Sequence, residues 1–217
     1  MAGRRREPGT SGPAPHAPTA VEQDYLKAVW AAREWSDEPV TAGALGRRLG
    51  VAPSTVTETL TRLVARGWVT RRPYGPVALT PEGERLALAV VRRHRLLETW
   101  LVRDLGYRWD EVHQEAEVLE HAVSDVFVER LDARLGRPDR DPHGDPIPGP
   151  DGSVPYRAGV PLASLGRGER GVVVRVSDQD PQVLRECAAC GVTLGSVVEA
   201  PAGLSTDALA AVRVTRL

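Results

Sequence analysis

Apolar residues recur three and four positions apart over residues 21–30, and this spacing predicts an amphipathic helix. Two shorter helical patterns follow, at residues 44–49 and from Pro53 onward, each followed by a glycine that permits a turn. Residues 68–72 and 77–79 are typical of two strands joined by a turn that contains proline and glycine. The order of helix, turn, helix and hairpin predicts a winged helix-turn-helix.

Two long helices are expected after this hairpin. Thr80 and Pro81 are typical of a helix start, and the helical pattern continues to about Leu105. A further helix is expected over residues 109–135, because glycine and proline follow it directly. The two helices predict a helical second domain.

The amino-acid composition of the chain changes after the second long helix. Residues 139–157 are rich in proline and glycine, which predicts an irregular connector. Beyond the connector, residues 172–174, 197–198 and 211–217 are typical of strands, and a short helix is expected over residues 183–189. The predicted fold class is therefore mainly α with small β parts.

The formal net charge of -1 conceals a split along the chain. Residues 1–80 carry 11 Lys and Arg against 7 Asp and Glu, whereas residues 81–140 carry 10 against 13. A basic amino-terminal part beside an acidic middle points to nucleic acid at one end of the molecule.

Several other classes of protein are not expected. The chain has no run of 18 apolar residues and no apolar segment of a secretion signal, so a cytoplasmic protein without membrane contact is expected. Cys187 and Cys190 cannot form a disulfide framework, and without a second pair of cysteines they make a poor zinc site. No residues combine a nucleophile, a base and an orienting group, so an enzyme with a small organic substrate is not expected.

The second helix of the predicted pair would lie in the major groove, where its first residues reach base edges. These residues are small and hydroxylated, which suits close approach to phosphates and thymine methyl groups. The candidates are Ala52, Pro53, Ser54, Thr55, Thr57 and Glu58, with Arg62 one turn further and with Arg71 and Arg72 on the wing. A winged helix that contacts only protein is the alternative.

His and Glu residues recur on the two long helices. His94 and Glu98 are four positions apart on the first helix. The second helix carries His113, Glu117, Glu120 and His121. On one continuous helix this spacing places all four on a common face, and such sets on facing helices build metal sites. A solvated charged face is the alternative, and His143 in the connector is interpreted as structural.

These segments resemble the diphtheria-toxin-repressor family of metal-dependent transcriptional regulators, most closely its manganese-responsive members. The resemblance is carried by Asp24-Tyr25-Leu26, the recognition helix, residues 91–98, residues 112–125 and connector residues 143–148. It implies a homodimer on palindromic operator DNA and an SH3-like (FeoA-like) third domain. The expected organisation is a disordered tail (1–20), a winged-helix domain (21–83), a helical metal-binding and dimerisation domain (84–138), the connector (139–157) and the third domain (158–217).

The resemblance also implies which residues would bind metal. A primary site would use Asp24, Glu117, Glu120 and His121. An ancillary site would use His94, Glu98 and His113, and further ligands from the third domain would come from Asp178, Gln179 or Asp180. Relatives with a bridged pair of ions carry a carboxylate where this chain has Lys27, so two separate sites are expected.

The implied ligands favour one metal over others. Iron-responsive relatives place sulfur donors where this chain has Asp24 and Glu117. Carboxylate and imidazole ligands favour Mn(II), then Fe(II), and Zn(II) and Co(II) should also bind in vitro. The expected function is a manganese-dependent regulator that represses manganese uptake. An Fe(II)-dependent repressor of the family, or a metal-sensing adaptor whose winged helix binds protein, is the alternative.

Overall fold

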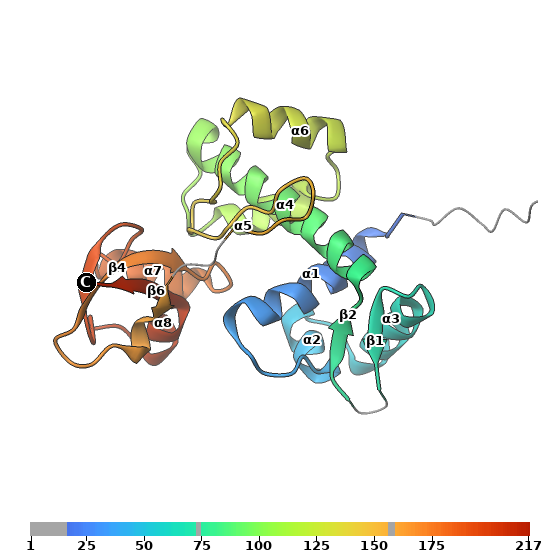
Figure 1. Cartoon of the computed structure of the whole chain (residues 1–217), viewed down its shortest axis with the longest axis horizontal. Coiled ribbons are helices and arrows are strands. Elements are labelled where there is room, and N and C mark those ends of the chain that lie inside the picture. The colour runs from blue at the N-terminus through green and yellow to red at the C-terminus, as the bar shows by residue number, and fades with distance from the viewer. Residues whose placement is uncertain (1–16, 73–74, 156–158) are drawn as a thin grey trace, which may run out of the picture.

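The computed structural model describes residues 17–72, 75–155 and 159–217. These residues form three lobes that meet near the middle of the molecule (Figure 1). A tail is expected over residues 1–20, and residues 1–16 of it lie outside the described residues. The first helix begins at Ala20. The turn expected between the two strands of the hairpin includes residues 73–74, which also lie outside them.

The first lobe is a winged helix-turn-helix, as the sequence predicts. Its elements are α1 (Ala20–Trp35), α2 (Ala42–Leu49), α3 (Pro53–Ala65), β1 (Val69–Arg71) and β2 (Val77–Leu79). Thr19 and Glu22 cap the start of α1 reciprocally, and Gly50 ends α2 with a φ of 64°. The two strands pair antiparallel, and Leu26, Leu45 and Leu60 fill the core between the helices.

The helix α4 (Pro81–Leu105) is 25 residues long and joins the first lobe to the second. Its first half packs Val91 into the core of the first lobe, and its second half packs Leu97 into the core of the second. Its start lies directly against the wing, because a Cβ at Gly83 would lie 1.9 Å from the Trp68 carbonyl oxygen. No helix in the described part of the chain is long and apolar enough to cross a membrane.

The single helix expected over residues 109–135 is wrong, because two helices occupy this stretch. They are α5 (Val112–Leu119) and α6 (Asp125–Arg134). Ser124 begins α6 as its N-cap and accepts a hydrogen bond from the backbone N–H of Phe127. The Arg93 guanidinium donates to the Glu120 carbonyl oxygen at 2.9 Å, so this carbonyl needs no helical partner. Glu120 and the residue after it therefore lie in a turn.

The third lobe is a small antiparallel sheet covered by short helices. Its elements are β3 (Val160–Pro161), the 3-10 helix η1 (Leu162–Ser164), β4 (Arg170–Val176), α7 (Pro181–Ala189), β5 (Val197–Glu199), α8 (Thr206–Ala211) and β6 (Val212–Arg216). The strand order is β3-β6-β4-β5, and neighbouring strands run antiparallel. The sequence pattern predicts β4, β5, β6 and α7 but not β3, η1 or α8.

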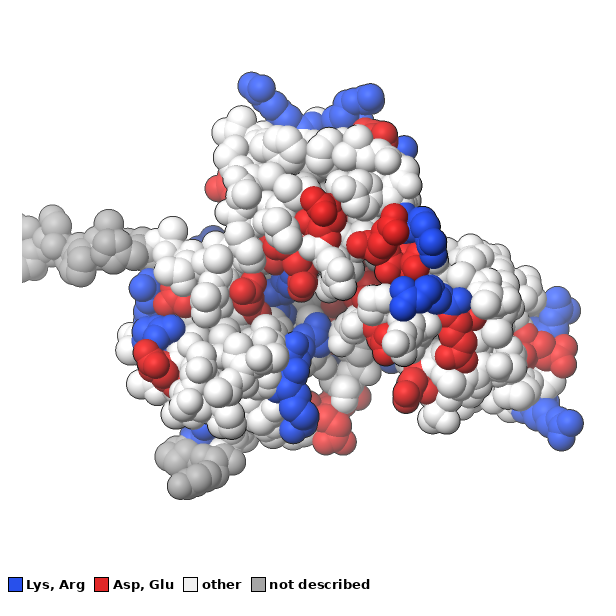
Figure 2. Space-filling model, turned by 180° about the vertical axis from the view of Figure 1, so that it is seen from behind, with Lys and Arg blue, Asp and Glu red and all other residues white. Residues whose placement is uncertain are grey.

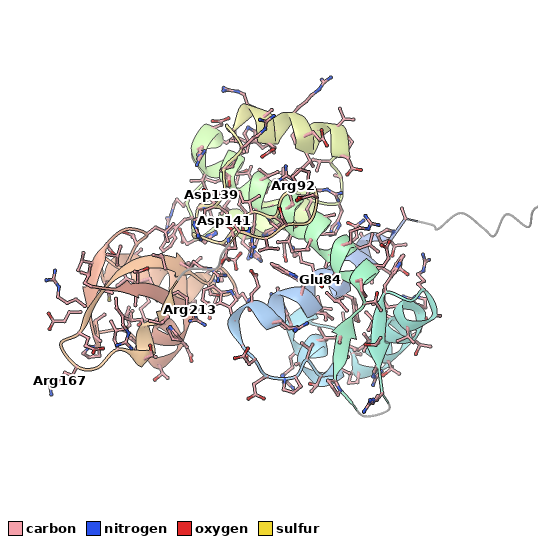
Figure 3. All side chains as sticks on the ribbon, viewed as in Figure 1. Glu84, Arg92, Asp139, Asp141, Arg167 and Arg213 are labelled. Carbon is pink, nitrogen blue, oxygen red and sulfur yellow. The ribbon has the colours of Figure 1, made fainter. Side chains whose placement is uncertain are left out.

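The connector between the second and third lobes runs along α4. The guanidinium groups of Arg92 and Arg95 donate to the carbonyl oxygens of Pro148 and Pro146, at 2.7 and 2.8 Å. Asp141 lies on this connector close to the place where the lobes meet (Figure 3). The connector thus carries buried carboxylates into the centre of the molecule.

Candidate metal centre

A cleft of about 1030 Å³ separates the first lobe from the second and third lobes. Its walls come from α1, α2, α5 and the start of α7, and its lining includes Asp24, His113, His121 and Gln179. Seen from behind, acidic side chains gather around the hollow where the lobes meet (Figure 2). Residues from distant parts of the sequence therefore share one space that is open to solvent.

The first group of candidate ligands consists of Asp24, Glu120 and His121, and we refer to it as the Asp24 group. One ligand atom from each residue lies within 4.8 Å of the others. His121 Nδ1 donates to the Gln23 side-chain oxygen at 3.0 Å, and its Nε2 faces Asp24 Oδ1 at 2.8 Å. Burial raises the pKa of Asp24, and His121 offsets part of this rise. The Asp24 group joins α1 to the turn after α5.

Glu120 is the buried member of the Asp24 group, and its side chain is 0% exposed. Lys27 Nζ donates to both carboxylate oxygens of Glu120, at 2.8 and 2.9 Å. His94 Nδ1 lies 2.5 Å from Glu120 Oε2. Burial alone would raise the pKa of Glu120, but His94 and Lys27 outweigh it and lower the pKa. Glu120 is therefore a buried carboxylate held by the Lys27 ammonium and the His94 imidazole.

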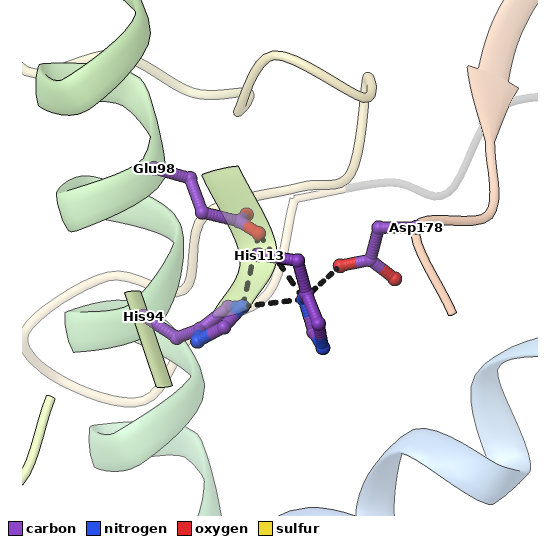
Figure 4. Close-up of side chains that lie close together, drawn as sticks. All are labelled: His94, Glu98, His113 and Asp178. Carbon is purple, nitrogen blue, oxygen red and sulfur yellow. Dashed lines mark hydrogen bonds and ion pairs between the residues drawn. The ribbon is translucent and has the colours of Figure 1, made fainter. Parts of the chain in front are cut away.

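The second group consists of His94, Glu98, His113 and Asp178, and we refer to it as the His94 group (Figure 4). His94 Nε2 lies 3.0 Å from Glu98 Oε1, and His113 Nδ1 lies 3.1 Å from Asp178 Oδ2. Burial opposes the charge of His113, yet its bonds to Asp178, Glu117 and Glu98 raise its pKa well above the ordinary value. Asp178 follows β4, so the third lobe completes this group.

The third group consists of Glu98, Asp141 and His143, and we refer to it as the Asp141 group. All three side chains are 0% exposed. His143 Nε2 donates to the Trp109 carbonyl oxygen at 2.7 Å, whereas its Nδ1 lies 3.8 Å from Glu98 Oε2. Sequence reasoning missed Asp141 and gave His143 only a structural role. The available signal was a carboxylate and an imidazole two positions apart in the connector.

The remaining candidate ligands lie elsewhere around the cleft. Glu117 is 52% exposed and pairs with His113 Nε2 at 3.4 Å, so it stands outside the Asp24 group. Gln179 accepts a hydrogen bond from Arg48 at 3.0 Å. Asp180 caps the start of α7 by accepting from the backbone N–H of the second residue of that helix. Of the three candidates from the third lobe, Asp178 alone joins a ligand group among the described residues.

The donor chemistry of the three groups fits a divalent cation. They offer carboxylate oxygens and imidazole nitrogens. Within the described residues, Glu98 Oε2, Asp141 Oδ2 and His143 Nδ1 are buried without a hydrogen-bond partner. Buried polar atoms without a partner are unfavourable, and a cation would satisfy these three. The cysteines lie apart on and after α7, with Cys187 buried in the core of the third lobe.

The expected DNA-contacting residues lie on the surface of the first lobe. Ala52 is the N-cap of α3, and its neighbours at the start of this helix are exposed. The exposed candidates are Ala52, Pro53, Ser54, Thr55, Thr57, Glu58, Arg62 and Arg72, and Arg71 is partly exposed on β1. Arg62 and Glu58 form an ion pair at 2.9 Å, so this arginine is partly neutralised in the free protein.

Comparisons with known proteins match all three lobes. The iron dependent repressor N-terminal DNA binding domain matches residues 19–77. The iron dependent repressor metal binding and dimerisation domain matches residues 80–149, and the FeoA domain matches residues 160–204. The matches follow the three lobes in order along the chain.

Individual relatives extend this similarity. The iron-dependent repressor IdeR of Mycobacterium leprae is 34% identical over 157 residues, which cover 69% of this chain and 68% of that protein. A solved manganese-dependent transcriptional repressor in complex with manganese is 46% identical, with a TM-score of 0.83 over 90% of this chain and 100% of that one. ScaR with bound Zn2+ is 28% identical, with a TM-score of 0.79 over 90% and 99%. Further IdeR and diphtheria toxin repressor relatives are matched over 54% of their own length.

A winged helix joined to a helical lobe rich in carboxylates and imidazoles defines a metal-responsive, DNA-binding regulator. The chain belongs to the iron-dependent repressor family, also called the diphtheria-toxin-repressor family. The resemblance seen in the sequence is thereby confirmed. The relatives are metal-dependent DNA-binding repressors, so the chain is a repressor of this family and not an enzyme.

Proposed function

We propose that this protein is a manganese-dependent repressor that binds a palindromic operator as a homodimer in the cytoplasm and represses manganese uptake. The observation that carries the proposal is the convergence of the Asp24 and His94 groups on one cleft beside α1. The proposed working units are residues 21–83, 84–138 and 158–217. An Fe(II)-dependent repressor is the second candidate, because iron-dependent IdeR is also a relative.

The donor set supports Mn(II) as the preferred ion. The proposed primary ligands are Asp24, Glu117, Glu120 and His121, and the proposed ancillary ligands are His94, Glu98, His113 and Asp178. All of them are oxygen or nitrogen donors. Carboxylates and imidazoles suit Mn(II), which lies low in the affinity series and is selected by geometry and availability.

The position of the ligands supports a coupling between metal and DNA. Asp24 lies on α1 of the first lobe, Glu120 follows α5 of the second, and Asp178 follows β4 of the third. These carboxylates repel one another across the cleft. A divalent ion supplies the positive charge that offsets this repulsion. The side chains then hold the three lobes, and with them α3, in one relative placement, which favours one conformation for DNA.

A homodimer would bring two copies of α3 to two half-sites of the operator. Val126 and Phe127, at the start of α6, are 62% and 38% exposed, and these exposed apolar side chains support pairing between copies of the chain. A symmetric dimer of helix-turn-helix units reads half-sites one helical turn of DNA apart, about 34 Å. The palindromic operator follows from that symmetry.

Fluorescence anisotropy on a palindromic operator tests the proposal. Mn(II) should tighten operator binding by about 50- to 100-fold, more than Fe(II) does, and His121→Ala should abolish this gain while the protein stays folded. Glu82→Ala serves as the control, because Glu82 forms only an exposed pair with Arg85 on α4. Operator binding that is equally tight without metal would contradict the proposal. A preference for Fe(II) would favour the second candidate.

A further inference from the structure

Lys27 lies on α1 one turn after Asp24, on the same face of the helix. Its side chain is 14% exposed, although lysine is seldom buried to this extent without a partner. Its Nζ donates to both carboxylate oxygens of Glu120, at 2.8 and 2.9 Å. The ammonium group is therefore held inside the Asp24 group by the buried carboxylate of that group.

The ammonium group also reaches toward the His94 group. Lys27 Nζ lies 3.3 Å from His94 Nδ1 and 3.7 Å from Glu117 Oε1. His94 in turn contacts Glu98 and His113 of its own group, at 3.0 and 3.1 Å. A fixed positive charge thus stands between the two groups of ligands, where a second ion would otherwise be close enough to share Glu120.

We propose that the Lys27 ammonium is a resident cation that limits the Asp24 group to one metal ion and competes with that ion for Glu120. The inference rests on the proposed function, since it takes Asp24, Glu120 and His121 as ligands. Like charges at short distance repel strongly where water is largely excluded. A second ion beside Lys27 is therefore disfavoured, and the first ion binds only when Glu120 releases at least one of its bonds to the lysine.

Lys27 is in this view a residue that determines metal stoichiometry and affinity. A simple structural ion pair would also hold Glu120, but the affinity for Mn(II) would then not rise when the charge is removed, and the number of bound ions would not rise when the charge is reversed. The proposed role and a structural ion pair therefore predict different Mn(II) affinities and different numbers of bound ions. Both predict that the metal-free protein loses stability without Lys27, so stability alone does not separate them.

The test compares Lys27→Met, Lys27→Glu and Lys27→Arg with the parent protein by Mn(II) equilibrium dialysis and electron paramagnetic resonance. Lys27→Met removes the charge and should bind Mn(II) in the Asp24 group about tenfold more tightly. Lys27→Glu supplies a carboxylate and should bind one additional Mn(II) per chain, seen as a spin-coupled pair. Lys27→Arg keeps the charge and should match the parent in stoichiometry. Arg33→Met, which removes an exposed charge from α1, is the control and should leave both the affinity for Mn(II) and the number of bound ions unchanged.

Three results would overturn the inference. The first is a folded Lys27→Met variant, verified by circular dichroism, that binds Mn(II) no more tightly than the parent. The second is a folded Lys27→Glu variant that binds no additional Mn(II). The third is a spin-coupled Mn(II) pair already present in the parent protein. Failure of the proposed function would give a different result. If His121→Ala bound as many Mn(II) ions per chain as the parent does, no ion would bind at the Asp24 group. That result would overturn both proposals together.

Discussion

His94 links the two ligand groups through a single imidazole ring. Its Nδ1 contacts Glu120 at 2.5 Å, and its Nε2 contacts Glu98 at 3.0 Å. Burial and Lys27 disfavour its charge, but the two carboxylates outweigh them and raise its pKa. Burial likewise opposes the charge of His143, and Glu98 raises the pKa of His143 to about 10. In the metal-free folded protein, these buried imidazoles therefore keep their protons at higher pH than in the unfolded chain, where histidine has its ordinary pKa of about 6.5.

This proton uptake predicts how stability depends on pH. A folded chain that binds more protons than the unfolded chain loses stability as the pH rises, by about 1.4 kcal/mol per pH unit and proton. The stabilisation is complete below pH 6.5 and falls as the pH rises toward the raised pKa values. The melting temperature of the metal-free protein should drop by at least about 3 °C between pH 6.5 and 8.5.

Calorimetry of the chelator-treated protein measures this slope. His113→Asn should flatten it, because His113 has a strongly raised pKa. A melting temperature that is constant or rises over this range would show that the imidazoles are neutral in the folded state.

At the scale of single residues, the sequence could reveal His94 and Glu98 because both lie on one continuous helix. Helical spacing of four positions is sufficient to place them together. Asp141 and His143 lie in a connector without period, and only tertiary packing brings them to Glu98. Their spacing in the connector places Asp141 near His143, but it contains no information about their contact with Glu98.

At the scale of elements, the helix break after α5 has a consequence for the ligands. A continuous helix would keep Glu117 and Glu120 on one face, as the sequence spacing predicts. In the structure, Glu120 turns into the buried interior, while Glu117 stays in the open cleft beside His113. Two features accompany the break: Ser124 caps the start of α6, and Arg93 donates to the Glu120 carbonyl oxygen. The pattern of apolar and polar residues predicts neither feature.

The start of α3 gives the prediction that belongs to this scale. Thr57 is exposed and donates its hydroxyl to the Pro53 carbonyl oxygen at 3.0 Å, so its side chain does not support the core. Thr57→Asp would place a negative charge where the helix meets the phosphate backbone. Operator affinity with Mn(II) should fall by about tenfold or more, with metal affinity of the free protein unchanged.

Ala65→Asp is the matched control, because Ala65 is exposed at the opposite end of α3. Its effect on operator affinity, measured by anisotropy, should stay within about twofold. Equal losses from both substitutions would indicate that α3 does not enter the groove by its first turn.

At the scale of the whole molecule, buried charges join the three lobes. Arg175 of β4 pairs with Asp145 of the connector and with Glu34 of α1, the latter at 3.7 Å. The ring of Trp35, the last residue of α1, lies 4.5 Å from the guanidinium carbons of both Arg175 and Arg213. The five residues come from four segments that are far apart in sequence, so no local pattern predicts that they meet. They attach the third lobe directly to the helix that carries Asp24.

Arg213 and Arg216 lie three positions apart on β6 and provide a matched pair of substitutions. Arg213 faces the first lobe (Figure 3) and donates to the Trp35 carbonyl oxygen at 3.3 Å. Arg216 pairs with Glu169 inside the third lobe at 3.1 Å. Because the third lobe supplies Asp178 to the His94 group, Arg213→Ala should weaken Mn(II) binding there by about fivefold, whereas Arg216→Ala should not. Isothermal titration calorimetry measures the affinity, and small-angle scattering should show a larger radius of gyration for Arg213→Ala alone. Equal behaviour of the two variants would mean that the contact with Trp35 does not hold the third lobe in place.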